Sequence, residues 1–159
     1  MRRFDLRSLR FDETSEAWRR LPVEVAPFVF GGLEYSVGGD GVVDVSLTAA
    51  KVGENMTLVC EFETTLHGPC QRCLDDAAVP LAARGVEYIR HGDSEIEDEE
   101  EDETGYVAAY NLDLERWVRD LIAEALPDKL LCRSECRGLC PLCGANLNED
   151  PGHGHEAAD

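Results

Sequence analysis

The chain has 159 residues, a formal net charge of −18 and a sequence pI near 4.4. This length predicts one domain, or one domain with a small metal-held appendage. Because nucleic-acid phosphates are contacted through positive charge, the acidity argues against DNA or bulk RNA as a ligand and favours a basic protein partner. The sequence holds no run of 18 consecutive apolar residues, so we expect no membrane partner.

The seven cysteines bear on the compartment. The arginines at the start of the chain are not followed by an apolar run, so we expect no signal peptide. In a reducing cytoplasm, cysteine patterns bind metal more often than they form disulfides. We therefore expect a cytoplasmic protein whose cysteines bind metal.

The first third of the chain reads as short elements. Residues 1–11 predict an opening strand with a basic face, and residues 14–21 predict a short helix that Pro22 ends. Residues 28–37 predict a strand that is bent or bulged at Gly31-Gly32.

The middle of the chain predicts long antiparallel strands. Apolar residues alternate with polar ones over residues 43–49 and 58–66, and the alternation resumes over 79–88 with a bulge expected at Arg84-Gly85. Cys70 and Cys73 then fall at the tip of a hairpin.

The last third changes character. Nine acidic residues between 93 and 103 repel one another and predict a disordered loop over about residues 92–106. A helix is expected over about residues 112–126, capped by Asn111 or Asp113 and stopped by Pro127. The expected organisation is a strand-rich body over residues 1–131 and a metal-binding knuckle with a tail over 132–159. The expected fold class is α+β, with an antiparallel sheet that could be barrel-like and one main helix.

Eight side chains outside the predicted sheet faces are candidate metal ligands, enough for two tetrahedral sites. They are Cys70, Cys73, Cys132, Cys136, Cys140, Cys143, His153 and His155. In the segment Cys140-Pro-Leu-Cys143-Gly, proline stiffens the turn and Gly144 can take a positive φ after the second sulfur. The expected cofactor is structural zinc, as one or two ions.

Two partitions of these ligands are open. The first gives Cys70, Cys73, Cys132 and Cys136 to one ion, and Cys140, Cys143, His153 and His155 to another. The second closes one site from the four later cysteines and leaves Cys70 and Cys73 as a spare pair. In that case the two histidines could also be plain tail.

Catalysis has little support in the sequence. Shells made mostly of thiolates are structural, and no carboxylate pair or phosphate-binding loop stands out, so we expect no enzyme. Cys70-Gln-Arg-Cys73 could be a redox dithiol, but such motifs open a helix after a strand, and here another strand follows. Cys60 lies on an apolar strand face, which predicts a buried, inert thiol.

Three segments resemble the YceD family, bacterial and plastid proteins linked to accumulation of large-subunit ribosomal RNA. They are residues 70–74 (Cys-Gln-Arg-Cys-Leu), the stretch from Asp113 to Pro127, and residues 136–148 (Cys-Arg-Gly-Leu-Cys-Pro-Leu-Cys-Gly-Ala-Asn-Leu-Asn). The family usually ends this motif with Cys-x-Cys, where this chain has His153-Gly-His155. Some relatives lack the later knuckle yet keep the first pair and ligand-type residues matching 132 and 136, which favours the two-site partition.

The resemblance implies a role in ribosome biogenesis and leaves two functional hypotheses. The first is a zinc-binding assembly factor that acts on a basic ribosomal protein or the pre-ribosomal large subunit. Local RNA contact would fall to arginines at positions 2, 3, 7 and 10, or to Arg133 and Arg137, although these could equally be ordinary surface residues. The second is a redox sensor in which oxidation of Cys70 and Cys73 releases the metal.

Overall fold

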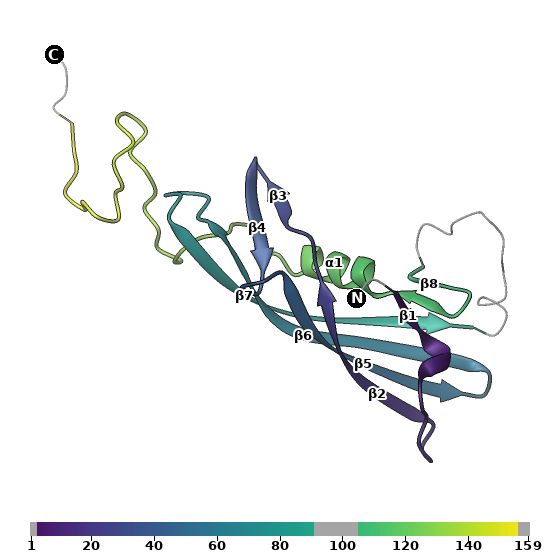
Figure 1. The fold of residues 1–159 in the computed structure, drawn as a ribbon. Helices are drawn as coiled ribbons and strands as arrows, with labels where there is room; N and C mark the ends of the chain where they lie inside the picture. Colours follow the sequence, from purple (N-terminus) through teal and green to yellow (C-terminus); the bar gives the residue numbers. More distant parts are fainter. Residues whose placement is uncertain (1–2, 91–104, 156–159) are drawn as a thin grey trace.

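A computed structural model of the protein describes residues 3–90 and 105–155. Figure 1 shows a long twisted sheet with one helix across a face, and a C-terminal segment that extends past one end. Most of the acidic stretch predicted as a loop over about residues 92–106 lies outside the described residues. Within the described ranges, no helix has both the length and the apolar character needed to cross a bilayer.

The main sheet has six strands and is antiparallel throughout. Its strand order is β2-β5-β6-β4-β3. Strands β5 and β4 pair with successive parts of one edge of β6, and β7 pairs along its opposite edge. The bounds are β2 (Glu16–Glu24), β3 (Phe28–Phe30), β4 (Leu33–Val37), β5 (Val42–Val52), β6 (Asn55–Pro69) and β7 (Asp76–Ile89).

Alternation of apolar and polar residues decides which face of the sheet is buried. On β5, Val43, Val45, Leu47 and Ala49 are all 0–1% exposed, while Asp44 between them is exposed. Leu58 and Cys60 on β6 continue the same face. The period-two pattern therefore predicted these two strands correctly.

The short helix predicted over residues 14–21 is wrong, because this segment belongs to edge strand β2. Ala17 and Val23 are buried in the core, and Arg20 on the opposite face of the strand is exposed. Pro22, which was interpreted as a helix stop, lies inside this strand opposite Asp44. An edge strand tolerates proline because one side of its backbone needs no ladder partner.

The single bent strand predicted over residues 28–37 is also wrong, because Gly31 and Gly32 turn the chain back. Strands β3 and β4 form a hairpin in which Phe30 pairs with Leu33. The φ angles of Gly31 and Gly32 are 59° and 81°, the combination that a two-residue type I′ turn requires.

The bulge predicted at Arg84-Gly85 is absent. Pairing of β6 with β7 is continuous from Met56–Ile89 to Pro69–Asp76. A Cβ atom on Gly85 would lie 2.8 Å from Leu121 Cδ2 and 2.8 Å from Trp117 Nε1. Glycine is therefore needed here for close approach of the helix. The apparent change of phase arises because Tyr88 is an apolar residue on the outward face, where it is 72% exposed.

The helix α1 (Leu114–Glu124) covers the inner face of the sheet. The Asp113 carboxylate caps it by accepting from the Arg116 backbone N–H at 3.1 Å. The helix buries Leu114, Trp117, Val118, Leu121 and Ile122.

A second, three-stranded sheet adjoins the helix, with the order β1-β9-β8. Its strands are β1 (Arg3–Asp5), β8 (Val107–Ala108) and β9 (Asn111–Asp113). The strand predicted for residues 1–11 is thus limited to β1, which the 3-10 helix η1 (Leu6–Ser8) follows.

The sheet does not close into a barrel, contrary to one expectation. Closure would require a ladder between β2 and β7, and within the described residues each of these strands pairs on one side only. Helix α1 contacts both strands, so it covers the apolar face that closure would otherwise bury.

Candidate metal centres

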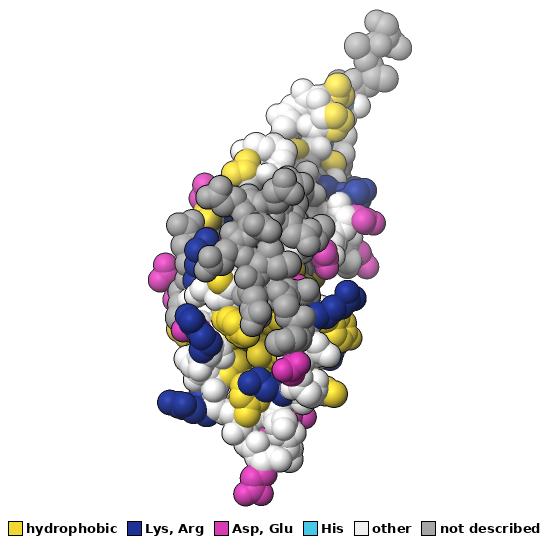
Figure 2. Space-filling view, turned by 90° about the vertical axis from the view of Figure 1, so that its right-hand side faces the viewer, with side chains coloured by type: hydrophobic (Ala, Val, Ile, Leu, Met, Phe, Trp, Pro, Cys, Tyr) yellow, Lys and Arg dark blue, Asp and Glu magenta, His cyan; other side chains and the backbone are white. Residues whose placement is uncertain are grey.

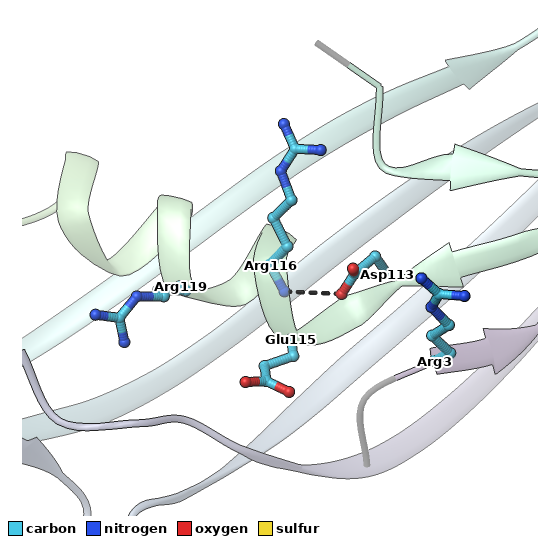
Figure 3. A pocket seen from close by; sticks show the side chains of 5 residues that line it. All are labelled: Arg3, Asp113, Glu115, Arg116 and Arg119. Atoms are coloured by element: carbon cyan, nitrogen blue, oxygen red, sulfur yellow. Dashed lines mark hydrogen bonds between the residues drawn. The ribbon is translucent and has the colours of Figure 1, made fainter. Parts of the chain in front are cut away.

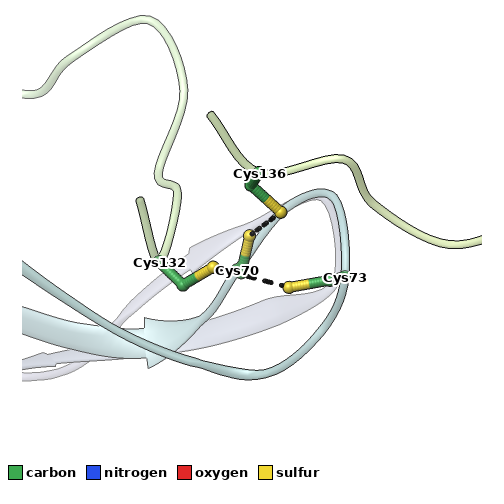
Figure 4. Close-up of side chains that lie close together, drawn as sticks. All are labelled: Cys70, Cys73, Cys132 and Cys136. Carbon is green, nitrogen blue, oxygen red and sulfur yellow. Dashed lines mark hydrogen bonds between the residues drawn. The ribbon is translucent and has the colours of Figure 1, made fainter. Parts of the chain in front are cut away.

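The first candidate centre joins the tip of the β6–β7 hairpin to the segment that follows the helix. Cys70 and Cys73 come from the hairpin turn, and Cys132 and Cys136 come from the segment (Figure 4). The Sγ atoms of Cys70 and Cys136 are 3.7 Å apart, and those of Cys73 and Cys132 are 3.6 Å apart. We call these four cysteines the four-sulfur group.

These separations fit a tetrahedral ion. Zinc–sulfur bonds of about 2.3 Å place the sulfurs of a tetrahedron about 3.8 Å apart. A disulfide would bring two sulfurs to about 2.05 Å, so the four thiols are unbonded to one another. The group can therefore hold a metal ion.

Burial makes negative charge costly in this group. Cys70, Cys73 and Cys136 are 0–3% exposed. Burial alone would raise the pKa of Cys70, but backbone N–H groups, including that of Arg72, outweigh it and lower the pKa to about 6. For Cys73, burial is the largest effect and raises the pKa. Four adjacent thiolates need a cation to offset their repulsion, and a dication would supply it.

Backbone contacts hold the segment against the hairpin. The Gln71 N–H donates to the Leu130 carbonyl at 2.9 Å, and the Leu139 N–H donates to the Arg72 carbonyl at 3.2 Å. A Cβ atom on Gly138 would lie 3.1 Å from that same Arg72 oxygen, and its φ is +76°. Glycine at 138 thus allows both the turn and the close approach.

The second candidate centre lies wholly within the C-terminal segment. It consists of Cys140, Cys143, His153 and His155. Cys140 Sγ lies 3.1 Å from His155 Nε2, Cys143 Sγ lies 3.2 Å from His153 Nε2, and the two Nε2 atoms are 3.2 Å apart. A tetrahedral zinc ion would place such atoms about 3.3–3.5 Å apart, close to these separations. We call this set the Cys/His group.

Electrostatics in the Cys/His group also suit a cation. Backbone N–H groups of Leu142 and Cys143, followed by the His155 ring, lower the pKa of Cys140 to about 6. His153 Nδ1 lies 3.6 Å from an Asp150 carboxylate oxygen, which orients the ring so that Nε2 faces the sulfurs.

The two centres are built on the same turn. In the hairpin, the Leu74 N–H donates to the Cys70 carbonyl at 3.0 Å; in the later segment, the Gly144 N–H donates to the Cys140 carbonyl at 2.8 Å. Both fifth residues have positive φ, 64° for Leu74 and 75° for Gly144. The expectation for Gly144 is confirmed, whereas sequence gave no signal for Leu74, since leucine rarely adopts this conformation.

Two asparagines support the centres, a role that sequence reasoning missed. Asn148 donates to Cys136 Sγ at 3.4 Å and accepts from the Arg137 N–H at 2.8 Å. Asn146 donates to the Asp75 carboxylate at 2.9 Å, which links the later segment to the hairpin. The available signal was their position in a turn-rich run directly after the cysteines, where asparagine favours side-chain to backbone hydrogen bonds.

The structure thus groups the eight predicted ligands as the two-site partition does. Cys132 and Cys136 lie with Cys70 and Cys73, and not with the later cysteine pair. Cys60 is buried in the sheet, where burial raises the pKa of its thiol to about 12.

A hollow of about 650 Å³ lies at the start of α1 and is a weaker candidate for a functional site than the two metal centres (Figure 3). Arg3, Arg116 and Arg119 alternate there with Asp113 and Glu115. Arg119 donates to the carbonyls of Ala26 and Pro27 at 2.6 and 3.4 Å, so its guanidinium fixes the chain before β3. The mixed charges do not single out a ligand.

Comparison with known proteins gives one family. The profile of the family described as large ribosomal RNA subunit accumulation protein YceD matches residues 58–159, which include both candidate centres. Two uncharacterized proteins, from Mycobacterium tuberculosis and Mycobacterium bovis, are each 33% identical over 130 residues. An uncharacterized protein of Mycobacterium leprae is 34% identical over 125 residues.

The matches leave part of these relatives uncovered. They span 80% of this chain and 63% of the Mycobacterium tuberculosis and Mycobacterium bovis proteins, and 78% of this chain against 51% of the Mycobacterium leprae protein. No solved structure matches the chain.

Proposed function

The chain belongs to the YceD family, and on this basis we propose that it is a non-catalytic, zinc-binding factor for accumulation of large-subunit ribosomal RNA. The observation that carries the proposal is the family match over residues 58–159, because this range contains all eight candidate ligands.

Donor chemistry supports zinc as the ion. The four-sulfur group and the Cys/His group present the Cys₄ and Cys₂His₂ sets of structural zinc sites, each with four ligands and therefore closed. Hard cations such as magnesium and calcium prefer oxygen donors, whereas the ligand atoms of both groups are sulfur and nitrogen. Zinc would tie the C-terminal segment to the β6–β7 hairpin.

Charge supports a basic ribosomal protein, or a pre-ribosomal particle presenting one, as the partner. The net charge of −18 attracts such a protein and disfavours non-specific RNA. The Lys and Arg side chains visible in Figure 2 stand apart from one another, with Asp and Glu among them. Arg7 is paired with Asp5 at 2.9 Å, and Arg137 donates to the Pro151 carbonyl at 2.9 Å. These two arginines therefore have structural roles. We accordingly assign direct RNA contact only a local, secondary part in binding the partner.

Affinity purification tests this function. The tagged chain is recovered from its own host at low salt, with and without ribonuclease, and ribosomal components are counted. Recovery of a basic large-subunit protein that survives ribonuclease and leaves at high salt supports the proposal. Loss of all ribosomal material on ribonuclease treatment would identify RNA as the ligand, and absence of such material in both arms would refute the assembly role.

A zinc- or thiol-based redox sensor is the competing candidate. The close Sγ pairs of the four-sulfur group favour it, because a metal-free group would leave thiols near enough to oxidise after a small movement. Mild peroxide would then release zinc and form a disulfide. Zinc retained under peroxide, measured by mass spectrometry of the intact protein, counts against this candidate.

A further inference from the structure

The face of the sheet turned away from α1, here called the outer face, carries an ordered apolar surface. Cross-strand register aligns Trp18, Thr48, Val59 and Val86 in one row over β2, β5, β6 and β7. The next row is Glu16, Ala50, Thr57 and Tyr88. We call the seven uncharged residues of these rows the aromatic platform; at a strand spacing of about 4.8 Å it is about 14 Å wide.

Two exposed aromatic side chains bracket this platform at the sheet edges. Trp18 is 57% exposed and Tyr88 is 72% exposed. The Trp18 indole N–H donates to Ser46 Oγ at 2.6 Å, which holds the ring over the neighbouring strand. Tryptophan and tyrosine are the residues that most often dominate protein interfaces, since they offer large area at low entropy cost.

The opposite end of the same outer face is acidic. Asp44 and Glu63 are exposed there, and Glu24 on β2 pairs with Val42 on β5. We call Glu24, Asp44 and Glu63 the acidic end. Trp18 and Glu24 are six residues apart on one strand, or about 20 Å.

The row between the two regions consists of Arg20, Ser46, Glu61 and Arg84. Arg84 donates to the Glu61 carboxylate at 2.7 Å, which offsets its charge, while Arg20 on the edge strand is exposed. An RNA strand laid along this face would bring its phosphates to the acidic end. A polypeptide with positive side chains would gain attraction there, so the charge pattern favours protein over RNA.

We propose that the outer face docks an extended basic segment of a protein partner. Apolar side chains of that segment pack on the aromatic platform, and its Lys or Arg side chains meet the acidic end. A stretch of about seven extended residues spans the distance. The inference rests on the proposed function, because it assigns the binding surface for the basic ribosomal protein.

Binding to large-subunit ribosomal proteins, purified and freed of RNA, tests the proposal. The platform variant is Trp18→Ala with Tyr88→Ala, and the acidic-end variant is Asp44→Lys with Glu63→Lys. The control variants change exposed residues elsewhere: Val29→Ala as the apolar control, and Glu13→Lys with Glu149→Lys as the charge-reversal control. Circular dichroism verifies that each variant is folded. Acrylamide quenching reports on contact with Trp18, because the other tryptophan, Trp117, is 2% exposed.

The expected result is a loss of affinity of about tenfold or more in the platform variant, with both controls unchanged. The acidic-end variant should also bind more weakly and lose most of the salt dependence. Equal binding by all variants would overturn the docking surface while leaving the proposed function intact. Binding of a large-subunit ribosomal RNA fragment that the platform variant abolishes and the acidic-end variant strengthens would overturn the choice of a protein partner.

Discussion

Removal of metal from the four-sulfur group is expected to release the segment after Leu130 from the hairpin while the sheet stays folded. Within the described residues, and apart from the contacts between the four sulfurs, five hydrogen bonds join the chain from Leu130 onward to the hairpin: Gln71 with Leu130 twice, Arg72 with Leu139 and with Cys136, and Asn146 with Asp75. At about 1 kcal/mol net each, they contribute about 5 kcal/mol.

Ordering the segment costs more than these hydrogen bonds return. Fixing the backbone of residues 131–140 costs on the order of 10 kcal/mol or more. A structural zinc ion contributes about 10–16 kcal/mol in small zinc-binding peptides, which is enough to reverse the balance. The ion, rather than the hydrogen bonds, should therefore keep the segment docked.

Limited trypsin digestion measures this release. Lys129, Arg133 and Arg137 are exposed in or beside the segment. After a zinc chelator is added, cleavage there should accelerate at least about tenfold, and a core fragment should survive. Cys70→Ser with Cys136→Ser should give the same result without chelator, whereas Cys143→Ser, which alters the Cys/His group only, should leave cleavage at Arg133 slow. Equal cleavage rates with and without metal would refute the reasoning.

Three further predictions follow from single features. Gly85→Ala should lower stability by about 1–3 kcal/mol in urea unfolding, because the added Cβ meets Trp117 and Leu121, while Gly39→Ala, with open space around it, should be nearly neutral. Asp113→Ala should lower the free energy of unfolding by about 1 kcal/mol, because it removes the cap of α1. An unchanged midpoint in the same urea titration would contradict this prediction. Backbone N–H groups lower the pKa of Cys70 and Cys140 to about 6 in the metal-free chain, so their thiolates are present above that pH and are lost as pH falls through it; the zinc affinity of the metal-free chain, measured with a colorimetric chelator, should therefore fall as pH is lowered from about 7.5 to below about 6, and a pH-independent affinity would count against thiolate ligands.

Strand alternation and cysteine spacing could be predicted from the sequence because both are local patterns. The run of valines and leucines on β5 and β6 has period two, and each cysteine pair carries its own turn. The same local reasoning assigned a helix to residues 14–21, since a nine-residue edge strand with proline gives a weak alternation that only pairing with β5 settles.

Features that depend on tertiary contact were beyond local patterns. Gly85 resembled a bulge, yet it serves the approach of Trp117 and Leu121, which lie more than thirty positions later in the chain. Trp18 and Tyr88 come together on the outer face only through the register of four strands. The joining of Cys70 with Cys136 likewise depends on how the segment after α1 returns to the hairpin.

The most direct test is the ratio of large-subunit to small-subunit ribosomal RNA in a host depleted of this chain. We expect the ratio to fall on depletion and to recover with the wild-type chain, but not with Cys70→Ser and Cys136→Ser together, provided that immunoblots show equal protein levels. An unchanged ratio after depletion would contradict the role in ribosomal RNA accumulation. Full recovery with the cysteine variant would contradict the requirement for metal.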